Sequence, residues 1–112
     1  MLIMDGLWTI EFGSTAGRFG AGVVVLRDGI IMGGDNGYFY LGTYELLGPR
    51  EFEAVLNVTP FVEGIESVFL TLGRNIQLKL SGALTSDGHA TARGYPVAMP
   101  DFALGVKLVR RT

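Results

Sequence analysis

The chain has 112 residues, which predicts a single domain over residues 1–112. Its hydrophobic share of 48% against 18% charged residues excludes intrinsic disorder, and the absence of cysteine excludes a disulfide scaffold or a thiolate metal site. A single histidine rules out a histidine-rich metal cluster, and a net charge of −2 with scattered basic residues argues against nucleic acid as the main partner.

Apolar residues recur with a period of two along most of the chain, and this pattern is typical of strands, whose alternate side chains point to opposite faces. Three consecutive valines in the apolar run 21–26 favour a buried strand. We expect strands, in chain order, over residues 7–12, 20–27, 30–32, 38–44, 52–58, 76–84, 89–95 and 102–108.

Short signals between and within these segments predict the connections. Asp28-Gly29 and Asp87-Gly88 are typical of tight hairpins, because both residue types tolerate positive φ. Gly42 lies inside an aromatic strand and is expected to mark a bend or bulge. Apolar residues at helical spacing over residues 61–72 predict one short helical turn between two strands.

Consecutive strands joined by tight turns predict an antiparallel meander. About eight strands in so short a chain must hide their edges, and closure does this best. The expected fold is therefore all-β: an antiparallel, eight-stranded, up-and-down, lipocalin-like β-barrel with at most one short helical turn. A flattened sandwich is the alternative.

No set of residues indicates catalysis. His89 follows a hairpin turn, and the spacing of Ser81, His89 and Asp101 does not match that of a nucleophile elbow. The glycine-rich stretch 13–22 lacks the Gly-Lys-Ser/Thr of a phosphate loop. Asp35-Asn36 is a candidate cation site, although capping of a turn is the better interpretation. We expect no enzymatic activity, no cofactor and no metal.

Tyr38, Tyr40 and Tyr44 form an aromatic stripe on one predicted strand. A tyrosine combines an apolar ring with a polar tip, which suits the wall of a ligand cavity or a protein-contact patch. The competing interpretation places the three rings on the outer face of the sheet. An eight-stranded barrel has an interior that side chains fill or that holds one small ligand, and the sequence leaves both open.

The first four residues are apolar but lack the preceding positive charges and the length of a signal peptide. No apolar run approaches the roughly 20 residues of a membrane-spanning helix. We expect a cytoplasmic protein without membrane insertion, and a secreted form without its signal peptide is the alternative.

Gly6-Leu7-Trp8 in the first strand, together with Arg110 or Arg111 in the last, resembles the structural signature of lipocalins and their calycin relatives. The resemblance implies that Trp8 closes one end of the barrel and that a basic side chain packs over it as a cation–π contact. The chain is shorter than a typical lipocalin, and it lacks the usual C-terminal helix.

A second resemblance covers nearly the whole chain. The ordered motifs are similar to those of GrlR-type negative regulators of type III secretion: Asp5-Gly6-Leu7-Trp8, the segment 20–26 with Asp28-Gly29, Gly33-Gly34-Asp35, Tyr38-Phe39-Tyr40, Gly42-Thr43-Tyr44, Ser67-Val68-Phe69 and Leu108-Val109-Arg110-Arg111. This resemblance implies a small cytoplasmic barrel, often dimeric, that regulates by sequestering a transcriptional activator.

The resemblance has one departure. The family's regulator uses an exposed acidic run to bind its activator, whereas here the acidic residues are interrupted, as in Glu51-Phe52-Glu53 and in residues 63–66. Glu51 and Glu53, with the three tyrosines, are the candidate contact residues for a partner or ligand.

Two functions follow from these observations. The first is a non-enzymatic regulatory barrel that binds another protein, and the alternative is a barrel that binds a small apolar ligand or lipid in its cavity. We also expect a homodimer, since the apolar share exceeds what so small an interior absorbs.

Overall fold

The computed structural model describes residues 4–112, and these residues form strands and loops without a helix. Consequently, this part of the chain has no helix of the length and apolar character needed to cross a bilayer. The strands, in chain order, are β1 (Gly6–Ser14), β2 (Phe19–Arg27), β3 (Ile30–Gly34), β4 (Tyr38–Leu46), β5 (Glu51–Pro60), β6 (Ile76–Ser86), β7 (His89–Pro96) and β8 (Leu104–Arg110).

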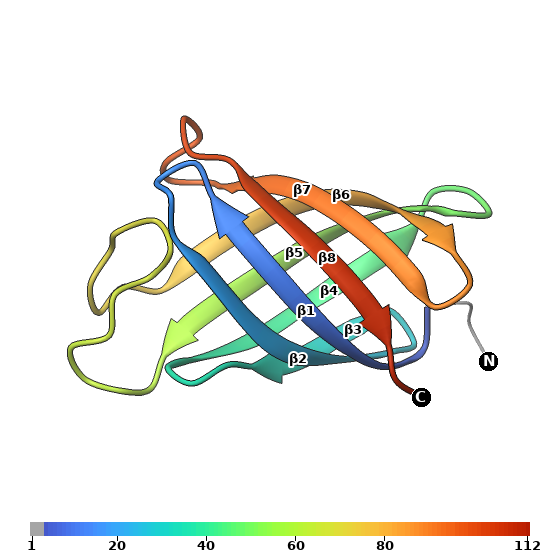
Figure 1. Cartoon of the computed structure of the whole chain (residues 1–112), viewed down its shortest axis with the longest axis horizontal. Coiled ribbons are helices and arrows are strands. Elements are labelled where there is room, and N and C mark those ends of the chain that lie inside the picture. Colours follow the sequence, from blue (N-terminus) through green and yellow to red (C-terminus); the bar gives the residue numbers. More distant parts are fainter. Residues whose placement is uncertain (1–3) are drawn as a thin grey trace.

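Each strand pairs with its neighbours in sequence, and β1 also pairs with β8, so the sheet closes on itself (Figure 1). All eight pairings are antiparallel. The closing seam runs from the Trp8–Arg110 pair to the Ser14–Leu104 pair. The predicted all-β, up-and-down barrel is confirmed, and the sandwich alternative is wrong because the pairing of β1 with β8 closes the sheet.

Both predicted hairpins are present. Asp28 and Gly29 have φ values of 51° and 83°, which is the backbone geometry that a two-residue turn between twisted strands requires. Asp87-Gly88 joins β6 to β7, with Gly88 at φ 76° and a shift of register between Leu84 and Ser86. That irregularity has the form of a β-bulge next to the turn.

The core lies inside the barrel and is built from alternate residues of every strand. In β5, for example, Phe52, Ala54, Leu56 and Val58 are buried while the residues between them are exposed. The same alternation corrects the expectation of a buried strand over residues 21–26. Val24 is buried, but Val23 and Val25 are 46% and 38% exposed, because a barrel strand has one face toward solvent.

Residues 61–75, here named the strap, connect β5 to β6 and hold turns and one isolated bridge, Glu66–Leu72, in place of the expected helical turn. Ser67 gives the local reason. Its hydroxyl oxygen accepts hydrogen bonds from the backbone N–H groups of Phe69 and Thr71, at 3.1 and 3.2 Å. Such side-chain bonds compete with the helical pattern. Of the apolar residues at helical spacing, Ile65, Val68 and Phe69 pack against the barrel, whereas Phe61 and Leu72 are 59% and 62% exposed.

Glycines allow neighbouring strands to approach closely. A Cβ atom at Gly33, Gly42 or Gly94 would meet the backbone carbonyl of Val23, Val55 or Lys79, respectively, on the adjacent strand. Gly42 pairs with Leu56 without a shift of register, so the expected bulge is absent there. The residue serves close packing of β4 on β5.

Candidate functional site

The barrel has two different ends (Figure 1). The β1–β2 and β3–β4 turns, the strap and the β7–β8 loop lie at one end, on the left of the view, here named the strap end. The start of β1 and the end of β8 lie at the other end. Side chains close the end at which β1 starts, whereas at the strap end exposed residues such as Asn36 and Glu66 line the interior cavity.

Trp8 fills the closed end. Its side chain is fully buried, and the indole Nε1 donates a hydrogen bond of 2.9 Å to the backbone carbonyl of Met4, which is itself buried. The Arg110 guanidinium carbon lies 4.9 Å from the centroid of the Trp8 ring, within the distance of a cation–π contact. The buried indole, with its N–H satisfied and its face covered by Arg110, therefore fills this end of the barrel.

The other two residues of this signature have different surroundings. The Arg111 guanidinium is exposed and its Nε donates a hydrogen bond of 2.9 Å to the hydroxyl of Thr9, so Arg110 is the arginine that covers the tryptophan. Gly6 has φ 142°, and a Cβ there would collide with the carbonyl of Thr112. Glycine is therefore needed where the C-terminal end crosses the start of β1.

A cavity of about 200 Å³ occupies the interior and is lined by all eight strands and by the strap. Most of the lining is aliphatic or aromatic, as in Ile10, Val24 and Leu56. Asp35 and Glu66 are the charged residues that line it within residues 4–112. The result is an apolar chamber whose ionisable groups are carboxylates.

The three tyrosines of β4 point inward, so their assignment to the outer face is wrong. Tyr38, Tyr40 and Tyr44 are 5%, 3% and 7% exposed, and all of them line the cavity. Each hydroxyl donates a hydrogen bond: Tyr40 to Asp35 Oδ2, Tyr44 to Asp5 Oδ1 at 3.1 Å, and Tyr38 to the carbonyl of Ile65 at 3.4 Å.

Burial raises the pKa of all three tyrosines above their ordinary value. For Tyr40 the neighbouring Asp35 raises the pKa further, both by accepting its hydrogen bond and by its negative charge. These hydroxyls are thus neutral at physiological pH and act as hydrogen-bond donors rather than as bases: Tyr40 and Tyr44 donate to carboxylates, and Tyr38 donates to a backbone carbonyl.

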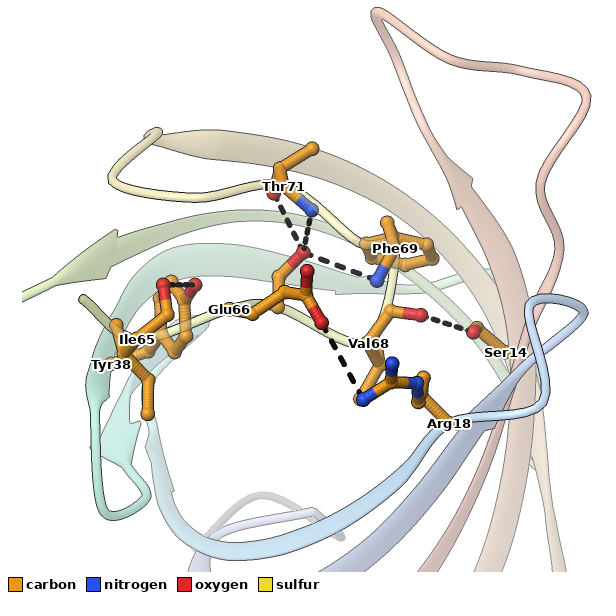
Figure 2. Close-up of polar contacts among 9 residues, drawn as sticks. Ser14, Arg18, Tyr38, Ile65, Glu66, Val68, Phe69 and Thr71 are labelled. Atoms are coloured by element: carbon orange, nitrogen blue, oxygen red, sulfur yellow. Dashed lines mark hydrogen bonds and ion pairs between the residues drawn. The ribbon is translucent and has the colours of Figure 1, made fainter.

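The strap crosses the strap end of the barrel and is held on both sides (Figure 2). On one side the Ser14 hydroxyl of β1 donates a hydrogen bond to the carbonyl of Val68, and the Arg18 guanidinium lies 3.4 Å from the Glu66 carboxylate. On the other side Ile65 receives the hydrogen bond from Tyr38. The strap is therefore fixed at two points across the opening.

Phe69 is the apolar anchor of the strap. It is 4% exposed, lines the cavity, and its ring centroid lies 6.0 Å from that of Phe102 in a tilted arrangement typical of aromatic pairs. Its backbone N–H is bonded to the Ser67 hydroxyl, which also contacts the Thr71 hydroxyl at 2.6 Å. The side chain is thus held over the interior by the loop that carries it.

Asp35 caps the β3–β4 turn. Its Oδ1 accepts hydrogen bonds of 2.9 Å from the backbone N–H groups of Gly37 and Tyr38, which satisfies that oxygen locally. Residues 4–112 hold no group of three or more metal-ligating side chains. The structure therefore places Asp35 in a turn, at the margin of the cavity.

The remaining candidate residues lie away from the cavity. Glu51 and Glu53 are exposed on the outer face of β5, and Glu53 pairs across the sheet with Glu45. His89 is exposed at the start of β7, and its ring contacts the carbonyl of Asp87 at 3.2 Å. Within the described residues, no hydrogen bond connects His89 to Ser81 or Asp101.

Two features of the surface were not found by sequence reasoning. One is the attachment of the strap by Ser14 and Arg18, which involves residues far apart in sequence. The other is the location of the apolar outer surface over β2–β4, which includes the cross-strand row Val25, Met32 and Leu41. Consecutive apolar residues in these strands place apolar side chains on both faces of the sheet, and this was the signal in the sequence for the apolar outer face.

The fold and the chamber define a class: a small, closed, up-and-down β-barrel with an apolar interior, sealed at one end and strapped at the other. Comparison with protein-family models and with curated proteins gives no match to this chain. The similarity of its motifs to GrlR-type regulators therefore stays a prediction.

Proposed function

We propose that this protein is a non-enzymatic binding protein that holds one small apolar ligand inside its barrel. The observation that supports this proposal is the cavity of about 200 Å³ with its apolar lining. Side chains can fill the interior of an eight-stranded barrel. Here Ala54 and Ala92 face inward and leave space that larger side chains would have filled.

The volume sets the size of the ligand. An engineered apolar cavity of about 150 Å³ binds benzene, and pockets for drug-sized ligands range over about 300–1,000 Å³. A cavity of about 200 Å³ lies between these limits. It fits a single aromatic ring or an aliphatic chain of roughly six to eight carbons.

The chemistry of the lining supports binding over catalysis. The three tyrosine hydroxyls have raised pKa values and are already hydrogen-bonded, and Asp35 Oδ1 is used by backbone N–H groups. A nucleophile or general base needs a pKa matched to its task and access to the substrate. The buried tyrosine hydroxyls offer neither, and the rest of the chamber is lined mostly by apolar side chains.

Titration calorimetry with octan-1-ol and with hexadecan-1-ol tests the proposal. We expect octan-1-ol to bind one to one and to raise the thermal midpoint, by an amount equivalent to about 2.7 kcal/mol at a hundredfold excess over Kd. Hexadecan-1-ol should bind much more weakly, because its chain exceeds the chamber. No binding by the shorter alcohol, and none by toluene as the aromatic probe, would refute the proposal.

A second function, contact with another protein, is supported by the outer face of β2–β4. Six outward apolar side chains there are 38% to 50% exposed: Val23, Val25, Ile30, Met32, Phe39 and Leu41. Contiguous apolar surface of this kind is typical of protein contacts. Because this set carries no charge, a second copy related by a two-fold axis brings no like charges together, and we propose a homodimer through this face.

This second proposal also accommodates the GrlR-like regulatory role, in which the cytoplasmic barrel acts by sequestering a transcriptional activator. Sedimentation of the purified chain at micromolar concentration should show a dimer, and Met32→Glu should convert it to a monomer. Thr91→Glu, on the outward face of β7, is the matched control and should stay dimeric. A monomeric wild-type chain, or an unchanged Met32→Glu dimer, refutes this interface.

A further inference from the structure

Within residues 4–112, the polar side chains that line the chamber lie toward its two ends, which restricts the position of a ligand's polar group. Side chains from the middle of the strands, such as Val24 and Leu56, are apolar and buried. A polar group placed there would lose its hydrogen bonds to water without replacement. At the opposite end Trp8 and Met4 are fully buried, and the Tyr44 hydroxyl that lines the chamber there already donates its hydrogen bond to Asp5. A ligand with one polar end must therefore direct it to the strap end.

The strap end presents negative charge to such a ligand. Asp35 and Glu66 line the chamber there, whereas no basic side chain does so within residues 4–112. Arg18 is close by, but its guanidinium is paired with the Glu66 carboxylate at 3.4 Å and does not line the chamber. Asp35, Glu66 and Arg18 together carry a formal charge of −1, and the two carboxylates are the members of this group that line the cavity.

This end also offers hydrogen-bond acceptors on its two carboxylates, beside the Asn36 amide, which lines the chamber there and both donates and accepts. A carboxylate can accept about four hydrogen bonds, and Asp35 accepts three, two on Oδ1 and one on Oδ2 from Tyr40. The ion pair with Arg18 uses Glu66 Oε1. The hydroxyls of Tyr38 and Tyr40 donate to Ile65 and Asp35, so these donors are already used.

We propose that the chamber selects a small amphiphile whose polar end is a hydrogen-bond donor, an ammonium group or a hydroxyl, and discriminates against carboxylates. This selectivity rests on the proposed binding of an apolar ligand and names the chemical class that the site takes. A carboxylate at the strap end would face Asp35 and Glu66 at close range, and like charges in a partly buried site repel. An ammonium or hydroxyl group would donate to the same oxygens.

Three probes with the same chain separate the effect of the polar end from that of the chamber. Octan-1-amine, octan-1-ol and octanoate are titrated calorimetrically into the full chain at pH 7 and low salt. We expect the amine to bind at least as tightly as the alcohol, and octanoate to bind at least about tenfold more weakly. Added salt should reduce the difference between amine and octanoate, because exposed charges are screened.

Two variants locate the effect. Glu66→Gln removes one carboxylate from the chamber and should narrow the preference for the amine over octanoate several-fold, while the affinity for the uncharged octan-1-ol changes less because the glutamine amide keeps one acceptor oxygen. Glu63→Gln makes the same change at an exposed strap residue that does not line the chamber, and it should leave the preference as in the wild type.

The outcomes distinguish the two proposals. Equal affinities for the three probes, or tightest binding of octanoate, would overturn the selectivity and leave ligand binding intact. Binding by none of them would overturn the proposed function itself. An equal effect of Glu63→Gln and Glu66→Gln would show a general charge effect of the strap, which also contradicts the assignment to the chamber.

Discussion

Filling the chamber should stabilise the free protein. Ala54 lies in the middle of β5, is 6% exposed and lines the cavity. The substitution Ala54→Leu adds three carbons that point into the vacant space. Outward-facing Ala83 of β6 provides the matched control, since Ala83→Leu adds the same three carbons on the solvent side of the sheet.

The size of the effect follows from the cavity volume. Residual cavities cost about 24 cal/mol per Å³, so complete filling of about 200 Å³ recovers at most about 5 kcal/mol. Three added methylene equivalents contribute about 0.8 kcal/mol each, or about 2.4 kcal/mol in total. Since part of this gain is lost to imperfect rotamers, we expect a net stabilisation of about 1–2 kcal/mol.

Urea denaturation of the wild type and both variants measures this free energy of unfolding. Ala54→Leu should raise it and should also weaken the binding of octan-1-ol, whereas Ala83→Leu should change neither by more than about 0.5 kcal/mol. In a packed interior, the added carbons would cost about 1–3 kcal/mol. A loss of this size in Ala54→Leu would refute the existence of a usable chamber.

Three further predictions concern the scaffold. Arg110→Gln should lower the free energy of unfolding by about 0.5–2 kcal/mol through loss of the contact with the indole, and Arg111→Gln should lower it by less. Urea denaturation of both variants measures this, and equal losses would contradict the assignment of Arg110 as the arginine that covers Trp8. Gly94→Ala should destabilise the protein by about 1–3 kcal/mol because its Cβ meets a backbone carbonyl, whereas Gly105→Ala, with open space around it, should be neutral or stabilising. Thermal denaturation of both variants measures the difference. Burial raises the pKa of Tyr40 in the folded state, so the neutral hydroxyl contributes to the free energy of unfolding. This contribution is complete below the ordinary pKa of 10.0 and is lost as the pH rises above it. Alkaline unfolding curves should show this loss reduced in Tyr40→Phe, and an unchanged curve would contradict it.

The fold could be predicted because its signals are local. Alternation in β5 predicts a strand with one buried face, and the Asp28-Gly29 turn predicts a hairpin between two consecutive strands. A closed meander follows when every strand pairs with the next. The helical spacing over residues 61–72 failed as a signal because Ser67 bonds the backbone locally and Phe69 packs into the barrel. Periodicity alone does not distinguish a helix from a loop that lies on an apolar surface.

The site was less accessible to sequence reasoning. The tyrosine stripe was a candidate, but its face could not be assigned, because β4 carries apolar residues on both faces, with Phe39 and Leu41 on the outside. The chamber itself depends on how much volume remains after all eight strands have contributed side chains. The contact of Arg18 with Glu66 depends on two loops that meet only in the closed barrel.

The β1–β8 seam has a consequence for how the chain reaches its native state. It pairs residues about a hundred positions apart, as in Trp8 with Arg110, and closing a loop of that length costs about 4 kcal/mol of chain entropy. The hairpins can form early, but during synthesis the sheet cannot close until β8 has been made. Until then the edges of β1 and β7 are unpaired and Trp8 is uncovered, so the nascent barrel is most prone to aggregation just before its last strand is added.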